Sequence, residues 1–350
     1  MWAAAAVALT LALLVGIAAY AWSELPRPPT RSAIPTGDPD PPPELSREVE
    51  SDLLDLYMPV LYLAPGENWR PIPVREFLRD SCISRQVASK WSACRDQDPA
   101  AEESALPRGA GVRLDVRVCQ VAGGPECYQN ESAEHELPRG AVYSRVYRNT
   151  TGQNEAVGYV LQFWLFYYFN DWQNDARNPT VWQFHEGDWE VVNVGLTEDL
   201  HPIYAAYSRH CTGGTRQWIK VETRDSTHPV VYVARGSHGN FFEPGPQPGS
   251  DECLPDAIRA LDLDINNVDA TGLGLSMGPG GKLPIDRIAL SDVPWLSFQG
   301  AWGEGNFIRY VNNRGARRSR AAGASPLGPA QHRHLWSDPV TVALADWSNE

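Results

Sequence analysis

Residues 159–169 read YVLQFWLFYYF, an apolar run that only Gln162 interrupts. Aromatic and β-branched residues of this kind are enriched in buried strands. Shorter candidate strands, separated by turn-like residues such as those at 197–199, lie at 60–63, 190–195, 202–208, 218–222 and 230–234. Several short strands at this spacing, with few helical patterns, are typical of a two-sheet fold. The sequence therefore predicts an all-β protein, an antiparallel β-sandwich with few short helices.

One short amphipathic helix is expected before the strands, because Leu45, Val49, Leu53 and Leu56 recur near the helical period. The glycine-rich stretch 272–282 lacks the pattern of a phosphate-binding loop, and the sequence has neither a dinucleotide fingerprint nor a nucleophile elbow. The formal net charge is −13. A nucleic-acid binder normally has a basic face and a basic isoelectric point, so this charge excludes nucleic acid as a partner.

The N-terminal part differs from the rest of the chain. Residues 1–22 carry no charge and would form roughly 33 Å of helix, enough to cross a hydrocarbon core of ~30 Å. The sequence thus predicts an N-terminal hydrophobic helix before the sandwich, either a transmembrane anchor in contact with the bilayer through residues 2–22 or a signal peptide cleaved near Ala21. Eight prolines at 23–46 predict an extended linker. Residues 47–350 are expected to form a single β-sandwich-like domain with loop insertions.

The pairing state of the six cysteines indicates the cellular compartment of the protein. They include no C-x-x-C pair, and nearest-neighbour pairing gives three disulfides, one of fifteen connectivities that six cysteines allow: Cys82–Cys94, Cys119–Cys127 and Cys211–Cys253. Disulfides indicate an oxidising compartment, whereas free thiols would indicate a cytosolic protein. Arg27 and Arg31 follow the apolar run, which by the positive-inside rule favours a cytoplasmic domain. We expect a single-pass membrane protein with an extracytoplasmic domain, or a protein secreted after cleavage.

Most of the chemistry-bearing residues lie in two short stretches, FNDWQND at 169–175 and HEGDWE at 185–190. Asp188 and Glu190 are two apart, so in a strand both carboxylates point to one face. His185 has the opposite parity, and a bulge or bend at Gly187 could rotate it back. Two carboxylates and an imidazole suit a divalent cation, Ca²⁺ or Mg²⁺ in first place and Mn²⁺ or Zn²⁺ in second. A further oxygen ligand is expected from the preceding loop, from Asp171 or Asp175.

Two more histidines, His210 and His238, lie at the ends of predicted strands, where a meander can return them to the same rim. Three hypotheses stay open on the residues alone. The cation bridges the protein to a polar ligand, such as a lipid headgroup or a glycan. Alternatively, the chain is a metal-assisted hydrolase, with the cation activating water and a side chain moving protons. In the third hypothesis, these residues form a structural hydrogen-bonded network without metal.

Several motifs resemble a known family. They are MPVLYLAPGENWRP at 58–71, YFND at 168–171, HEGDWE at 185–190, HPVVYVARGSHGNFF at 228–242 and GAWGE at 300–304. In this order they resemble the vacuolar protein sorting-associated protein 62 family over roughly residues 50–340. The resemblance implies a fold and a site more than an activity.

The central motif is also similar to that of necrosis- and ethylene-inducing toxins, which are secreted β-sandwiches that bind a divalent cation and plant sphingolipids. That resemblance implies a cation site at His185, Asp188 and Glu190, with Asp171 or Asp175 as its upstream aspartate. The motif departs from the toxins at Phe184, Glu186 and Gly187, where they have Gly, Arg and a second His. Cation binding is therefore expected more than toxicity. Four tryptophans are expected to surround the motif: Trp164, Trp172, Trp182 and Trp189.

Overall fold

The computed structural model describes residues 43–344, apart from 89, 110, 133–136, 176–178, 211, 249–267, 313, 322 and 325. The predicted anchor or signal peptide at 1–22 lies outside the described residues, and so does most of the predicted linker at 23–46. Among the helices that are described, none has the length and apolar character needed to span a membrane.

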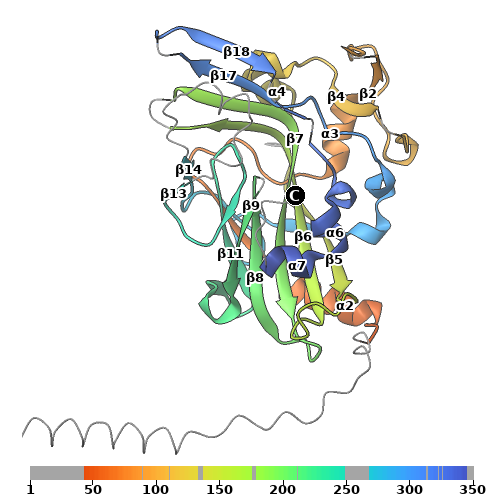
Figure 1. Ribbon diagram of the computed structural model, residues 1–350, viewed down its shortest axis with the longest axis vertical. Coiled ribbons are helices and arrows are strands. Elements are labelled where there is room, and N and C mark those ends of the chain that lie inside the picture. Colours follow the sequence, from red (N-terminus) through yellow and green to blue (C-terminus); the bar gives the residue numbers. More distant parts are fainter. Residues whose placement is uncertain are drawn as a thin grey trace, which may run out of the picture. The chain divides into compact units, whose positions relative to one another are not determined.

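The largest sheet has eight strands and is built around the pair β6–β7 (Figure 1). Its strands run in the order β16–β5–β6–β7–β17–β18, and β8 pairs with the second half of β7 and with β9. The bounds are β16 Ile285–Ala289, β5 Gly140–Arg148, β6 Tyr159–Gln173, β7 Val181–Leu196, β17 Phe307–Val311, β18 Arg317–Ala321, β8 Pro202–Arg209 and β9 Thr212–Gln217.

A second sheet of five strands packs on the first. It has the order β10–β11–β1–β15, with β12 paired to β11. The bounds are β10 Thr223–Arg224, β11 His228–Val233, β1 Val60–Leu63, β15 Ser276–Met277 and β12 Asn240–Phe241. Alternate residues of β1 and β11 (Leu61, Leu63, Val231 and Val233) are buried in the same hydrophobic core as the large sheet. Since successive side chains of a strand point to opposite faces, this alternation places one face of the second sheet on that core.

Smaller elements complete the described part of the chain. One small sheet has the order β3–β2–β4, and another pairs β13 with β14. Their bounds are β3 Lys90–Trp91, β2 Ser81–Val87, β4 Val112–Val116, β13 Pro246–Pro248 and β14 Val268–Ala270. The helices are short: α2 Arg47–Leu56, α3 Val74–Asp80, α4 Pro125–Glu131, α6 Arg333–Ser337 and α7 Pro339–Leu344. The predicted all-β class with few short helices is therefore confirmed.

Two parallel pairings correct the expectation of purely antiparallel sheets. Val60 of β1 pairs with Val230 of β11, and Ile285 of β16 pairs with Gly140 of β5, both in parallel. A tight hairpin forces its two strands to be antiparallel, but strands that come from distant parts of the chain have no such constraint. The sheets are therefore mixed.

Gln162, the one polar residue of the apolar run, has its hydrogen bonds satisfied inside the protein. Its Oε1 accepts from Arg145 at 2.7 Å, and its Nε2 donates to Asn193 and to the carbonyl oxygen of Leu335, each at 2.9 Å. Leu335 belongs to α6, so this side chain connects the sheet to the C-terminal helices. A buried amide costs little when it is fully hydrogen-bonded, because no desolvated donor is left unpaired.

The prediction of a strand at 218–222 was wrong. Strand β9 ends at Gln217, and Trp218–Lys220 form a 3₁₀ turn. Ile219 is 90% exposed there, whereas Trp218 packs edge-on against Tyr57 of the chain following α2. The alternation of apolar and polar residues thus arises from a turn in which one aromatic ring is partly buried, a pattern that cannot be distinguished from a short strand by periodicity.

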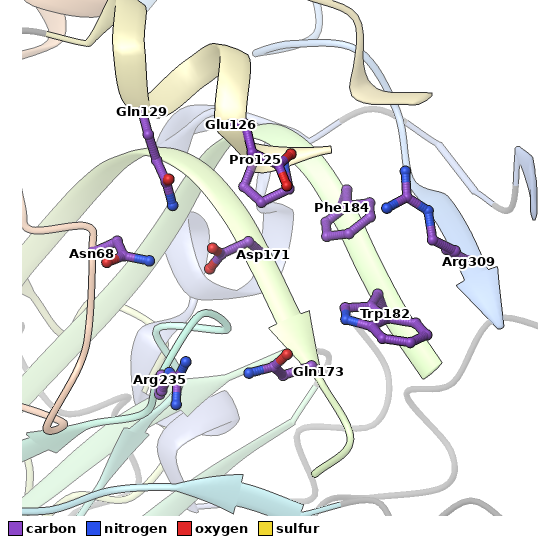
Figure 2. A pocket seen from close by; sticks show the side chains of 10 residues that line it. All are labelled: Asn68, Pro125, Glu126, Gln129, Asp171, Gln173, Trp182, Phe184, Arg235 and Arg309. Carbon is purple, nitrogen blue, oxygen red and sulfur yellow. The ribbon is translucent and has the colours of Figure 1, made fainter. Parts of the chain in front are cut away.

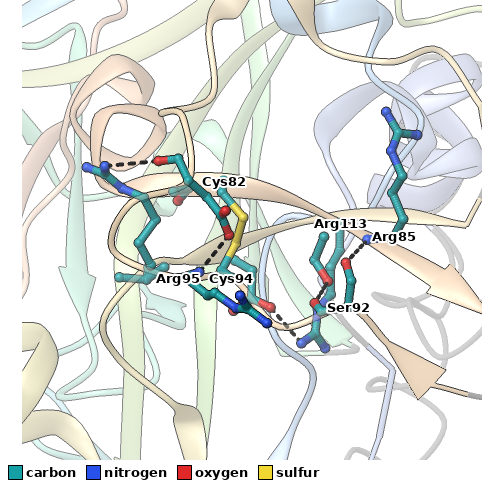
Figure 3. The surroundings of a disulfide bond; sticks show 12 residues. Cys82, Arg85, Ser92, Cys94, Arg95 and Arg113 are labelled. Carbon is teal, nitrogen blue, oxygen red and sulfur yellow. Dashed lines mark hydrogen bonds and ion pairs between the residues drawn. A yellow bond between two sulfur atoms is a disulfide. The ribbon is translucent and has the colours of Figure 1, made fainter.

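Two of the three predicted disulfides are present. Cys82–Cys94 and Cys119–Cys127 have Cα–Cα distances of 6.0 and 5.7 Å, within the usual range for a disulfide. The first joins the start of β2 to the chain after β3, and between it and the turn of this hairpin the Arg85 amide donates to the Ser92 hydroxyl at 2.8 Å (Figure 3). Cys211 and Cys253 lie outside the described residues.

Candidate functional site

The two motif stretches lie side by side because β6 and β7 are antiparallel neighbours. Asn170 pairs with His185 and Tyr167 pairs with Asp188, in the same register on both sides of Gly187. Gly187 itself has a φ of +55°, in the left-handed region that glycine tolerates. Gly187 therefore departs from regular strand geometry, and the unchanged register shows that no residue is inserted there as a bulge would require.

Asp188 is paired with His238. The His238 Nδ1 lies 2.8 Å from Asp188 Oδ2, and its ring stacks on Tyr167 at 3.9 Å with an interplanar angle of 4°. Burial alone would raise the pKa of Asp188, but the hydrogen bond from His238 and the nearby histidines lower it. Burial opposes the charge of His238, yet the bond to Asp188 and the Glu67 carboxylate raise the pKa of this imidazole. Each partner thus stabilises the charged form of the other.

Glu190 lies two residues further along β7 and is fully buried. It accepts a short hydrogen bond from the Ser208 hydroxyl of β8. Burial, together with the negative charge of Asp188, raises the pKa of Glu190 well above its ordinary value. The charge of Asp188 thus makes the charged form of Glu190 more costly, and a nearby cation would reduce that cost.

His210 forms a second ion pair next to the first. Its Nε2 lies 2.8 Å from Asp269 Oδ2, and Ser237 donates to Asp269 Oδ1 at 2.6 Å. Burial opposes the charge of His210, but Asp269 raises the pKa of this imidazole, and the charge of Asp188 acts in the same direction. His210 and His238 therefore both belong to the electrostatic surroundings of Asp188.

Asp171 lies on the other side of His238. Burial and the Glu67 carboxylate raise the pKa of Asp171 to about 7, against the opposing charge of His238. Glu67 Oε2 accepts from the amide of Gly236 at 2.6 Å, and Glu67 Oε1 lies 3.9 Å from His238 Nε2. That His238 nitrogen is buried and has no hydrogen-bond partner among the described residues.

His185 has the tautomer that a metal-binding imidazole needs. Its Nδ1 lies 2.9 Å from the carbonyl oxygen of Gly187 and 3.3 Å from that of Glu186. Because a carbonyl only accepts, Nδ1 carries the proton of the neutral ring, and Nε2 keeps its lone pair. Burial lowers the pKa of His185, which favours this neutral form. Metal-bound histidines commonly donate their other N–H to a backbone carbonyl in this way.

We call these residues the polar centre: Glu67, Asp171, His185, Asp188, Glu190, His210, His238 and Asp269. The contacts and charges above connect six residues that the sequence singled out. Asp171 is the upstream aspartate among these six residues, and Asp175 lies beyond the end of β6. Sequence reasoning missed Glu67, Asp269, Ser208 and Ser237. Glu67 and Ser237 lie within family-like motifs, whereas Asp269 and Ser208 have no distinguishing local pattern.

A separate acidic cluster includes Glu186, the sequence neighbour of His185. Asp115, Glu186 and Glu304 each place a carboxylate oxygen within 4.8 Å of the others, a spacing at which they could hold a metal ion. The guanidinium of Arg113 already supplies a positive charge there, 2.8 Å from Asp115. Glu186 accepts from the Tyr128 hydroxyl and the Glu304 amide, each at 2.8 Å. The cluster therefore ties β4, α4 and β7 together.

A pocket of about 230 Å³ opens beside Asp171 (Figure 2). Its floor comes from three neighbouring strands, since Asp171 pairs with Phe184 and Trp182 pairs with both Gln173 and Arg309. Cross-strand partners share one face of a sheet. The remaining walls are formed by Asn68, by Arg235 and by the α4 residues Pro125, Glu126 and Gln129.

Only one of the four tryptophans near the motif faces this pocket. Trp182 lines it, whereas Trp164 and Trp189 pack together in the core, Trp189 also contacting Trp295 and Trp302. Trp172 is buried as well. The tryptophan-rich composition therefore reflects the core more than the walls of the site.

Comparisons with known proteins agree with the motifs. No protein-family model matches the chain. The chain is 27% identical over 173 residues to vacuolar protein sorting-associated protein TDA6 of Saccharomyces cerevisiae, and 26% identical over 170 residues to vacuolar protein sorting-associated protein 62 of the same yeast. The resemblance to the vacuolar protein sorting-associated protein 62 family is confirmed. The matches cover 42% of this chain in both cases, and 36% and 35% of the relatives, so the match spans about a third of their length.

Solved structures with some likeness include two of the toxin type. One is NLPPya in complex with mannosamine, at 13% identity and a TM-score of 0.32, covering 75% of this chain and 83% of that one. Another is necrosis and ethylene inducing protein 2 from the causal agent of witches' broom disease of cocoa, at 16% identity and a TM-score of 0.28, covering 58% of this chain and 70% of that one.

Proposed function

We propose that this chain is a ligand-binding module in which a divalent cation, held by the polar centre, bridges the protein to a polar ligand. The observation that carries the proposal is the contact of His185 Nδ1 with the Gly187 carbonyl oxygen at 2.9 Å. Because the carbonyl only accepts, Nε2 of the neutral ring keeps its lone pair for a cation. Asp188, Glu190 and Asp171 would supply the oxygen ligands, and their side chains would have to move together on binding, since among the described residues the carboxylates already within 4.8 Å of one another are those of Asp115, Glu186 and Glu304. A bound cation would act as a Lewis acid toward an oxygen of the ligand.

The electrostatics of the polar centre support this proposal. Burial raises the pKa values of Asp171 and Glu190, which means that their negative charges are costly without a counter-ion. His238 Nε2 is a buried polar atom without a hydrogen-bond partner among the described residues, and Glu67 Oε1 lies 3.9 Å from it. A purely structural network would be expected to satisfy such an atom.

The test is metal analysis of the purified full chain, followed by thermal melting with EDTA, Ca²⁺, Mg²⁺, Mn²⁺ or Zn²⁺. We expect one equivalent of cation and a stabilisation of about 3 kcal/mol at a hundredfold excess over its Kd. His185→Gln should abolish both effects, whereas His201→Gln, at an exposed turn, should not. Absence of stoichiometric metal, with melting unchanged by EDTA, would leave the structural network as the correct hypothesis.

We also propose that the module works outside the cytoplasm, tethered by residues 1–22 or released after their removal. The two disulfides support this proposal, because disulfides persist in oxidising compartments. The uncharged N-terminal run supports it as well. Expression of the full chain with N-terminal sequencing of the product distinguishes the anchor from the signal peptide.

A further inference from the structure

The pocket beside Asp171 has a composition that the proposed function does not explain. Two arginines, three amides and a tryptophan line it: Arg235, Arg309, Asn68, Gln129, Gln173 and Trp182. We infer that its ligand is an acidic sugar, a single pyranose ring bearing a carboxylate or phosphate. The inference rests on the proposed function, because the cation at Asp171 is part of the charge balance of the pocket.

The charge balance favours an anion. Asp171 and Glu126 are offset in the pocket by Arg235 and Arg309, so a divalent cation at Asp171 leaves a net positive pocket. The whole chain has a formal charge of −13, and a general attraction for anions is therefore not expected. The positive potential is local, and close opposite charges in a partly enclosed site contribute most to selectivity.

Arg235 is available to contact the anion. Among the described residues, no hydrogen bond or ion pair is formed by its guanidinium, which faces the pocket in Figure 2. Arg309 is more constrained, because it donates to the carbonyl oxygen of Ala122 at 3.3 Å and lies 5.4 Å from the centre of the Phe184 ring. A guanidinium presents two parallel N–H groups that match a carboxylate or a phosphate.

The rest of the lining suits a sugar ring. Trp182 offers an apolar surface, and the amides of Gln129 and Gln173 offer both donors and acceptors for hydroxyl groups. The pocket measures about 230 Å³, below the roughly 300–1,000 Å³ of sites for drug-sized ligands. One ring fits this size better than an oligosaccharide.

The experiment is calorimetric titration of the full chain, saturated with the cation that it binds, with methyl glucuronide, methyl glucoside and glucosamine. We expect methyl glucuronide to bind at least tenfold more tightly than the other two. Arg235→Gln should reduce this preference to less than threefold, and Arg309→Gln should weaken it independently. The control is Arg314→Gln, an exposed residue between β17 and β18, which should retain the preference. Circular dichroism verifies that each variant is folded.

Metal binding is measured separately, in titrations without sugar. Loss of cation binding contradicts the proposed function, whereas a metal-loaded protein that does not discriminate glucuronide from glucoside, or binds neither, contradicts only the acidic-sugar inference. A second arm presents the same glucuronosyl group on a lipid in phosphatidylcholine vesicles. Co-sedimentation with these vesicles identifies a lipid headgroup as the source, and binding of the soluble sugar alone identifies a free glycan.

Discussion

Gly187 shows how one residue shapes the site. Its φ is +55°, and a Cβ atom there would lie 2.1 Å from the carbonyl oxygen of Trp302. The positive φ disfavours any other residue because a Cβ atom is strained in that backbone conformation. The short distance disfavours any other residue because the Trp302 oxygen is a backbone atom that cannot easily move. The same conformation directs the Gly187 carbonyl oxygen to His185 Nδ1. Gly187 therefore sets both the bend of β7 and the tautomer of a proposed ligand.

Replacing this glycine is expected to destabilise the fold strongly. Gly187→Ala should lower the free energy of unfolding by about 3–5 kcal/mol, the sum of a left-handed alanine and a steric clash. Gly152→Ala is the matched control, since Gly152 has a φ of +66° but no atom within 4 Å of an added Cβ. It should cost about 1 kcal/mol. Urea denaturation of the two variants measures the difference, and equal losses would contradict the steric argument.

Asp115 provides a prediction on pH. Burial raises the pKa of Asp115 to about 6, against the opposing charge of Arg113. An acid with a raised folded-state pKa contributes stability below its unfolded pKa near 4, and this contribution is lost as the pH rises through 6. Between pH 4 and pH 7, the stability of the wild type relative to Asp115→Asn should therefore fall, by about 3 kcal/mol at most.

Denaturation at a series of pH values measures this difference. Asp286→Asn is the control, because Asp286 has a side chain that is 55% exposed and pairs with Arg139 at the surface. Its stability relative to the wild type should change little over the same range. If the free energy of unfolding of Asp115→Asn depended on pH in the same way as that of the wild type, the charge of Asp115 would be well tolerated in the folded state.

At the scale of elements, local patterns predicted strands well and pairings poorly. The predicted strand 60–63 coincides with β1, and the predicted strands 159–169, 202–208 and 230–234 lie within or overlap β6, β8 and β11. The parallel pairing of β1 with β11 joins Val60 to Val230, and no local signal encodes a contact over that separation. The start of the strand predicted at 190–195 was also missed, since β7 begins at Val181.

Helix α4 is the element whose position is most relevant to ligand binding. It supplies one wall of the pocket, and Cys119–Cys127 ties its first turn to the preceding chain. Tyr128 stacks on Phe169 at 4.0 Å and donates to Glu186. The seven residues of α4 are too few to be helical alone, since isolated helices of fewer than ~12 residues are marginal in water. The disulfide and the contacts of Tyr128 therefore stabilise α4.

Removal of this disulfide should affect both stability and binding. Cys119→Ser/Cys127→Ser is expected to lower the free energy of unfolding by roughly 2–3 kcal/mol and to weaken methyl glucuronide binding severalfold, because α4 becomes less ordered. Cys82→Ser/Cys94→Ser opens a loop of similar length, with a separation of 12 against 8 residues, and its cysteines do not line the pocket. This control should lose similar stability but keep its affinity. Equal affinities of the two double variants would contradict the role of α4.

At the scale of the whole molecule, the site was predictable where one strand carries it. His185, Asp188 and Glu190 lie within six residues of β7. Strand alternation predicted that Asp188 and Glu190 share a face, and His185 required the irregular backbone at Gly187 as well. The amide of Gly236 bonds to Glu67 across 169 residues, and Asp269 reaches His210 across 59. Such contacts depend on how the two sheets pack, which no short motif determines. The sequence therefore predicted the polar-centre residues of β7 but not Glu67 and Asp269.

The compartment is also a property of the whole chain, and it can be tested without knowledge of the ligand. Two of the three expected disulfides are present, and the third, Cys211–Cys253, stays a prediction. Protein taken unreduced from its native source should, after denaturation, have no thiol that reacts with maleimide, and a non-reducing peptide map should contain all three pairs. Four unreactive cysteines with two reactive ones would contradict only Cys211–Cys253. Six reactive cysteines would place the chain in a reducing compartment, since these disulfides would persist in an oxidising one, and the extracytoplasmic proposal would then be wrong.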